Sequence, residues 1–211
     1  MHPDDLTAAL LRERLADTRL PENPLDVTMP PGAERWPPDL REAVLSTLRP
    51  AGVLMPLIER DTGLNVLLTQ RSGELKHHAG QIAFPGGGME EADADIEATA
   101  LRETHEEVGI EPADVSVIGY LDPMATISSY AVTPVIGLVR DSVELILDPT
   151  EVELAFEVPL GFLLDRRNVV AGERQWQGRT IPVVEMLYDG HRIWGATAYF
   201  LLRLRKKILD H

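Results

Sequence analysis

Residues 86–111 read GGGMEEADADIEATALRETHEEVGIE, a glycine run followed by an acidic segment. The glycines, preceded by proline, predict a break in regular structure. Apolar periodicity then predicts a helix over 93–108, with Asp93 or Asp95 as its N-cap and Gly109 just beyond its last residue. The stretch holds nine acidic residues and one arginine, so it carries −8 of the chain's net charge of −14.

Three glutamates of this segment, Glu103, Glu106 and Glu107, are spaced i, i+3 and i+4. On a helix this spacing puts the three carboxylates on one face, where like charges repel one another. A divalent cation would reverse that repulsion, and hard oxygen ligands suit Mg²⁺ or Mn²⁺. By spacing alone, the pattern is more often a solvated acidic helix face, so the spacing is weak evidence for a metal.

The segment from Gly87 to Ile110 ends in RETHEEVGI and resembles the Nudix box, the metal-binding loop–helix–loop of the Nudix hydrolases. Members of that family cleave a nucleoside diphosphate linked to another moiety. The resemblance implies that Glu103 and Glu107 are the principal metal ligands and that Glu106 is a further ligand or a proton acceptor. It also implies that Arg102 orients a box glutamate and that the bound ion is Mg²⁺ or Mn²⁺.

The match departs from the family pattern at two points. One extra residue separates the first acid from the arginine, so either Asp93 or Asp95 can take the place of the structural acid. Thr104 occupies a position that is usually aliphatic. Gly87 and Gly109 match the glycines of the pattern, which serve at the loop and at the helix end.

Residues upstream of the box are similar to the signature that precedes it in coenzyme A diphosphatases, spacing included. They are Leu67–Ser72, Lys76, Gly80 and Phe84–Gly87, with Lys76 in place of an arginine. Later segments are also similar to those enzymes: Gly119–Pro123, Val132–Val135 and Trp194–Ala198. The resemblance implies hydrolysis of coenzyme A or its derivatives to 3′,5′-ADP and a 4′-phosphopantetheine species.

A substrate with a diphosphate needs cationic and backbone donors in an acidic protein. Arg71 and Lys76 are candidate phosphate contacts, although ordinary surface charges would look the same. Gly86 and Gly87 are candidates to present backbone N–H groups, although turn formation alone also explains glycines. Glu151, in a later acidic stretch that also holds Glu153, is the candidate general base, since Nudix enzymes often draw an extra acid from a loop.

Histidines and tryptophans give weaker indications. None of His77, His78 and His105 forms an H-E-x-x-H pair, which favours loop, hydrogen-bonding or substrate-contact roles over zinc binding. Trp176 and Trp194 are candidates to stack on adenine, but large aromatic residues are more often part of the core.

Hydrophobic patterning outside the box predicts one α/β architecture. We expect a Nudix-type α/β/α sandwich with a mixed sheet over 49–211, preceded by an extension, 1–48, that consists of a helix and a proline-rich strap. Helices are expected at 5–19, 39–47 and 196–209, a hairpin at 51–70, and further strands at 82–84, 114–121, 131–139, 143–147, 174–186 and 190–194. We expect the extension to cover part of the fold or to form an oligomer interface. The sequence does not decide whether the protein is a monomer or a homodimer.

Composition bounds the remaining alternatives. The absence of cysteine excludes disulfides and thiol chemistry, and the charge of −14 argues against nucleic acids and anionic membranes as partners. With no signal peptide or apolar span in view, we expect a cytoplasmic enzyme that acts on a small molecule. Alternatives are a Nudix enzyme for ADP-ribose or a nucleotide sugar, a non-catalytic Nudix-like sensor, and a likeness of fold alone. The intact glutamates favour an enzyme over a sensor.

Overall fold

The computed structural model describes residues 6–75, 78–176 and 178–210, and a mixed sheet lies at its centre. Among the described strand pairs of this sheet, β1 and β7 are parallel, and all other pairs are antiparallel. The strands of this sheet are β1 (Arg49–Arg60), β2 (Gly63–Arg71), β3 (Ile82–Ala83), β4 (Gly86–Gly88), β5 (Val115–Tyr120), β6 (Met124–Ala125), β7 (Tyr130–Val139) and β8 (Val152–Pro159).

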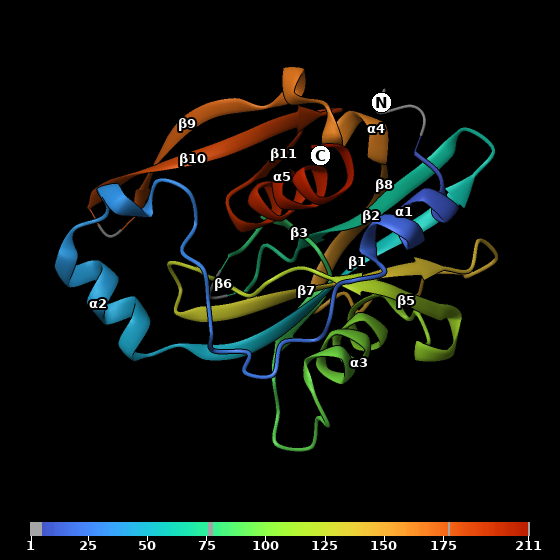
Figure 1. Cartoon of the computed structure of the whole chain (residues 1–211), viewed down its shortest axis with the longest axis horizontal. Helices are drawn as coiled ribbons and strands as arrows, with labels where there is room; N and C mark the ends of the chain where they lie inside the picture. Colours follow the sequence, from blue (N-terminus) through green and yellow to red (C-terminus); the bar gives the residue numbers. More distant parts are fainter. Residues whose placement is uncertain (1–5, 76–77, 177, 211) are drawn as a thin grey trace.

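Helices cover both faces of this sheet, and a second sheet lies on the outer side of one of these helices (Figure 1). On one face lies α3, and on the other lie α1 and α5, with the second sheet of β9, β10 and β11 on the outer side of α5. The helices are α1 (Ala8–Leu15), α2 (Pro38–Ser46), α3 (Ile96–Val108), α4 (Leu160–Leu164) and α5 (Ala196–Leu209), and the second sheet comprises β9 (Val170–Trp176), β10 (Arg179–Tyr188) and β11 (His191–Trp194). Short 3₁₀ turns are η2 (Ala33–Arg35), η3 (Pro112–Asp114) and η4 (Arg166–Asn168). The predicted α/β class with a mixed sheet is confirmed.

The central strand β1 is buried on both faces. Leu54, Met55 and Leu57 are fully buried, as expected for a strand covered by helices on each side. Below it, Leu54 packs with Ala100 of α3, while Met55 and Leu57 belong to the main core, which includes Phe200 of α5. The predicted hairpin over 51–70 is confirmed as β1 and β2.

Two predicted strands were wrong. Residues 143–147 form no strand, because this segment crosses the end of α3, where the backbone N–H groups of Ile146 and Asp148 donate to the carbonyls of Val108 and Glu107. The last carbonyls of a helix lack partners within the helix and need such donors. These hydrogen bonds decide the conformation of the segment, although its apolar pattern is that of a strand. The single strand predicted over 174–186 is instead the β9–β10 hairpin.

Smaller corrections concern glycines and helix ends. Gly178, with φ +76°, lies in the turn between β9 and β10. This glycine is the turn signal that the prediction of a single strand over 174–186 overlooked. The glycine run predicted as a break contains β4, which pairs with β1. The helix expected at 5–19 is the shorter α1, which begins after the N-cap Thr7. The helix predicted over 196–209 is confirmed as α5.

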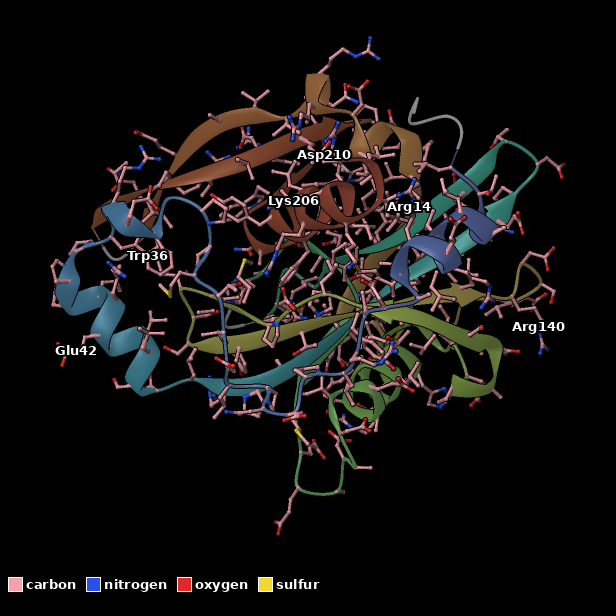
Figure 2. The ribbon with its side chains drawn as sticks, viewed as in Figure 1. Arg14, Trp36, Glu42, Arg140, Lys206 and Asp210 are labelled. Carbon is pink, nitrogen blue, oxygen red and sulfur yellow. The ribbon has the colours of Figure 1, made fainter. Side chains whose placement is uncertain are left out.

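The N-terminal segment follows the body of the fold closely. Leu11 and Leu15 of α1 are buried in the main core, and Thr28 forms a bridge with Met124. Further along, Trp36 packs against β10 in a separate apolar cluster (Figure 2). No helix in the described part of the chain is long and apolar enough to cross a membrane.

Candidate active site

Arg102 links the acidic residues of the box to one another. Its guanidinium forms ion pairs with Asp93 at 2.9 Å, with Glu103 at 3.0 Å and with Glu106 at 2.9 Å. It also donates to the backbone carbonyl of Gly88 at 3.2 Å. These contacts, above all the hydrogen bond to Asp93, raise the pKa of Arg102. One arginine therefore fixes the box loop, the helix and two candidate metal ligands together.

Asp93 and Asp95, which the sequence leaves as alternatives, have different tasks. The Asp95 carboxylate accepts from the backbone N–H of Ala98 at 2.9 Å and is the N-cap of α3. The Asp93 carboxylate binds Arg102 and also accepts from Thr99 Oγ1 at 3.0 Å. The hydrogen bond from Arg102 lowers the pKa of Asp93 to about 2. Asp93 is thus the structural acid beside the box arginine.

Glu107 is the most deeply buried acid of the box, with 2% of its surface exposed. Its carboxylate contacts Arg71 Nη1 at 3.3 Å and accepts from the backbone N–H of Gly86 at 3.3 Å. Burial, together with the neighbouring carboxylates of Glu151 and Glu103, raises the pKa of Glu107 to about 8, and Arg71 acts in the opposite direction. Arg71 is therefore the positive charge that partly offsets the burial of this carboxylate.

The other two glutamates differ in exposure. The side chain of Glu103 is 16% exposed, and burial raises its pKa, whereas the side chain of Glu106 is 55% exposed. Gly87 leaves space for Glu103, because a Cβ at this position would lie 2.4 Å from the Glu103 carboxylate. Any larger residue at Gly87 would therefore displace a candidate ligand.

Glu151 approaches the same cluster from the loop before β8. The backbone N–H of Ser72 donates to its carbonyl at 2.8 Å, which ties this loop to the end of β2. Its carboxylate raises the pKa of both Glu103 and Glu107, so the three acids act on one another. Glu153 instead accepts from Gln70 at 3.3 Å, outside this group.

The chemistry of the cluster suits a hard divalent cation, but its side chains are held by arginines. Glu103 and Glu106 bind Arg102, and Glu107 binds Arg71. Within the described residues, no three acidic or histidine side chains are arranged as ready ligands of an ion. The oxygen donors and the deep burial of Glu107 fit Mg²⁺ or Mn²⁺.

A cavity of about 1060 Å³ extends between the two sheets, and the glutamates of the cluster are not among the described residues that line it. Arg71, Gly86, Gly87 and Gly88 line its near end, which adjoins Glu107. Its far end is apolar and is lined by residues from the N-terminal segment and the second sheet: Pro30, Trp36, Ile181, Pro182, Val183 and Trp194. A cavity of this size holds a ligand as large as a dinucleotide.

Several lining residues were missed by the sequence interpretation. Arg49 lies over the ring of Tyr130, 4.4 Å from its centroid, and Arg174 lies 5.5 Å from that of Trp194. Trp36 was read only as part of the strap. The pairing of Arg49 with Tyr130 follows from the parallel register of β1 and β7, for which the sequence carries no local signal.

The remaining candidates are distributed unevenly. His78 lines the cavity, with Nδ1 3.0 Å from Gln81 Oε1, whereas His105 is on the surface, 3.6 Å from Glu111. Trp194 is partly exposed in the cavity wall. Lys76 and His77 lie outside the described residues, as does the side chain of Trp176.

Comparisons with known proteins show what the chain is similar to. The family model described as the NUDIX domain matches residues 48–176. The uncharacterized Nudix hydrolase NudL of Pectobacterium atrosepticum is 40% identical over 176 residues, which cover 82% of this chain and 89% of that protein. NudL of Escherichia coli strain SMS-3-5 is 39% identical over 160 residues, 76% of this chain and 83% of that protein. The crystal structure of the Nudix hydrolase RenU from M. smegmatis shares the fold, with a TM-score of 0.51 and 21% identity over 75% of this chain and 84% of that one.

Proposed function

The chain belongs to the Nudix hydrolase family, whose members act on diphosphate bonds, and from this premise we propose that it hydrolyses coenzyme A or a coenzyme A derivative. The bond cleaved is the diphosphate, and the products are 3′,5′-ADP and a 4′-phosphopantetheine species. Water supplies the oxygen that joins one phosphorus, and the other phosphate leaves.

One observation carries the choice of substrate. Four residues of the segment that resembles the coenzyme A diphosphatase signature line the cavity: Arg71, Phe84, Gly86 and Gly87. Arg71 is also the residue that contacts Glu107. Residues of the signature thus line the cavity and also contact Glu107 of the box, which supports a single substrate that touches both motifs.

Glu103 and Glu107 would hold Mg²⁺ or Mn²⁺, with Glu106 as a further ligand. A bound divalent ion neutralises the diphosphate and lowers the pKa of a coordinated water. Arg102 keeps Glu103 and Glu106 on one side of the helix through its two ion pairs. Burial of Glu107 next to Glu103 and Glu151 makes a cation at this position favourable, because it would relieve their mutual repulsion.

The protein's own groups orient the substrate and move the proton. Arg71 and Lys76 contact phosphate oxygens, and Gly86 and Gly87 bring backbone close to the diphosphate. Glu151 is the proposed base that accepts the proton of the attacking water, because it is the acid that reaches the cluster from another segment. That proton then passes from Glu151 to the leaving phosphate or to solvent.

A substrate panel tests the proposal. We expect the protein with Mg²⁺ or Mn²⁺ to convert coenzyme A or an acyl derivative to 3′,5′-ADP, with less turnover of ADP-ribose, NADH and diadenosine polyphosphates. A chelator-treated sample is the control. Turnover of ADP-ribose with none of any coenzyme A compound would reject the substrate, and no turnover of any diphosphate would favour a ligand sensor.

A further inference from the structure

Three arginines in the described part of the chain line the cavity, and they differ in their partners. Arg71 pairs with Glu107, and Arg174 pairs with Glu185 at 2.5 Å. No carboxylate among the described residues forms an ion pair or hydrogen bond with the guanidinium of Arg49, which rests on the ring of Tyr130. In a chain with a net charge of −14, an arginine that faces a cavity without an acidic partner is available to an anion.

Hydroxyl-bearing residues line the same cavity as this guanidinium. The loop before β7 contributes Thr126, Ser128 and Ser129 to the cavity lining, next to Tyr130. The backbone N–H of Arg49 donates to the Ser129 carbonyl at 3.0 Å, which fixes the loop to the start of β1. Arginine and neutral hydroxyl donors together match the oxygens of a phosphate monoester.

The loop before β7 contains one residue with an uncommon backbone conformation. Ser129 has φ +61°, an uncommon value for a residue with a side chain. Hydrogen bonds from Ser129 N–H to the Thr126 carbonyl, at 3.0 Å, and from Tyr130 N–H to Thr126 Oγ1, at 3.1 Å, maintain it. The hydroxyl-bearing loop is thus preorganised beside Arg49.

This group lies at a fixed offset from the acidic cluster. Arg49, Ala51 and Val53 alternate along β1 and all line the cavity, so they share one face of the strand. Gly86, whose N–H binds Glu107, pairs with Val53, four residues from Arg49. Four residues of strand span about 13 Å, which leaves room for a sugar between the diphosphate and the guanidinium.

We infer that Arg49, with the hydroxyls of Thr126, Ser128 and Ser129, binds a phosphate monoester on the nucleoside half of the substrate, separate from the diphosphate. The inference rests on the proposed function, and it names the residue that selects substrates with this phosphate. Arg49 is a binding residue and takes no part in the bond cleavage.

Binding of two non-reacting nucleotides tests the inference directly. In calorimetric titrations with Mg²⁺ present, we expect the wild-type protein to bind 3′,5′-ADP roughly tenfold more tightly than 5′-AMP, the scale of one hydrogen-bonded charge contact. Arg49→Ala should bind both within about twofold of each other, and Arg49→Lys should retain part of the preference. Equal binding of the two nucleotides by the wild type, or an undiminished preference in Arg49→Ala, would overturn the inference.

Arg41→Ala is the matched control, because Arg41 is an exposed arginine of α2 outside the cavity and its loss changes the net charge equally. It should keep the full preference for 3′,5′-ADP. Neither nucleotide contains a diphosphate bond, so the result does not depend on turnover. A protein that hydrolyses ADP-ribose but no coenzyme A compound would fail the proposed function, while the titration would still decide the role of Arg49.

Discussion

The candidate site has two ends, the acidic cluster and the apolar end of the cavity, and they are built by opposite means. At the acidic end, Arg102 and Arg71 hold Asp93, Glu103, Glu106 and Glu107 through ion pairs. At the apolar end, buried side chains from three distant segments pack together: Ala33, Trp36, Val44, Ala125, Ile181 and Val183. The acidic end concentrates charge at a cost in stability, and the apolar end contributes stability and shape. Chemistry and recognition are therefore separable by mutation.

The largest effect is expected from Glu107→Gln at the acidic end. Loss of this carboxylate should lower kcat/KM at least about a thousandfold, the scale of removing one transition-state stabiliser. The metal-free variant should be as stable as the wild type or more so, because a neutral amide avoids a buried charge. Turnover and thermal melting of the same preparations measure both.

Glu91→Gln is the control for that variant, since Glu91 is an exposed acid of the same segment. It should leave turnover unchanged. Near-normal activity of Glu107→Gln at low metal concentration would contradict the assignment of Glu107 as a ligand.

Trp36→Ala tests the apolar end. Trp36 is 7% exposed, and its removal should lower the free energy of unfolding by about 3 kcal/mol, as for other large-to-small core changes. Because Trp36 lines the cavity far from the glutamates, KM should rise while kcat stays near the wild-type value. Urea unfolding and steady-state kinetics provide the two measurements.

Two further variants keep that test interpretable. Trp36→Phe retains an aromatic ring and should show a smaller shift of both quantities if the alanine variant is too unstable to assay. Leu45→Ala removes an exposed leucine from the same N-terminal segment and should change little. A fall in kcat with an unchanged KM for Trp36→Phe would mean that the two ends are not separable.

Asp93→Asn separates the structural from the chemical charges of the acidic end. The pKa of Asp93 is about 2 in the folded protein and about 3.9 in an unfolded chain. Its stabilising contribution is therefore complete above about pH 4 and is lost as the pH falls from about 4 to 2. At pH 7 the variant should lose about 2 kcal/mol of unfolding free energy, and the difference from the wild type should shrink at pH 3.

The companion variant is Asp95→Asn. Asparagine is as good an N-cap as aspartate, so this change should cost little at any pH. A loss for Asp95→Asn equal to that for Asp93→Asn would show that the helix cap, and not the ion pair with Arg102, accounts for the effect.

The contrast between the ends also explains what the sequence could predict. The helix, its C-terminal glycine and the shared face of the three glutamates depend on residues within two turns of one another, and all were predictable by spacing. The apolar end depends on contacts between Trp36 and Ile181, which only the complete fold brings together. Likewise, Arg49 meets Tyr130 through the register of a parallel strand pair.

The sequence left Asp93 and Asp95 as alternatives for a different reason. Both residues are suited to cap a helix, and only the position of Arg102 in space distinguishes them. The strand wrongly predicted over 143–147 had the right apolar pattern, but the unpaired carbonyls at the end of α3 accepted its N–H groups. Local patterns predict elements, and competition for hydrogen bonds decides between them.

The smallest expected effect concerns Thr104, the departure from an aliphatic residue in the box. Thr104 is fully buried, and its Oγ1 donates to the Ala100 carbonyl at 2.6 Å. That carbonyl already accepts the backbone N–H of residue 104 in the helix, so the hydroxyl's bond satisfies only the hydroxyl donor and no otherwise unpaired group. We expect Thr104→Val to stabilise the fold by less than about 1 kcal/mol and to leave kcat/KM unchanged.

Thr99→Val is the matched comparison, because Thr99 is equally buried on the same helix but its hydroxyl donates to Asp93. Removing that donor leaves a buried carboxylate less well bonded and should destabilise the protein by about 1 kcal/mol. Urea unfolding of both variants measures the difference. If Thr104→Val were the more damaging of the two, then the hydroxyl at 104 would be part of the charged network, and the acidic end would extend one turn further along α3 than the ion pairs of Arg102 indicate.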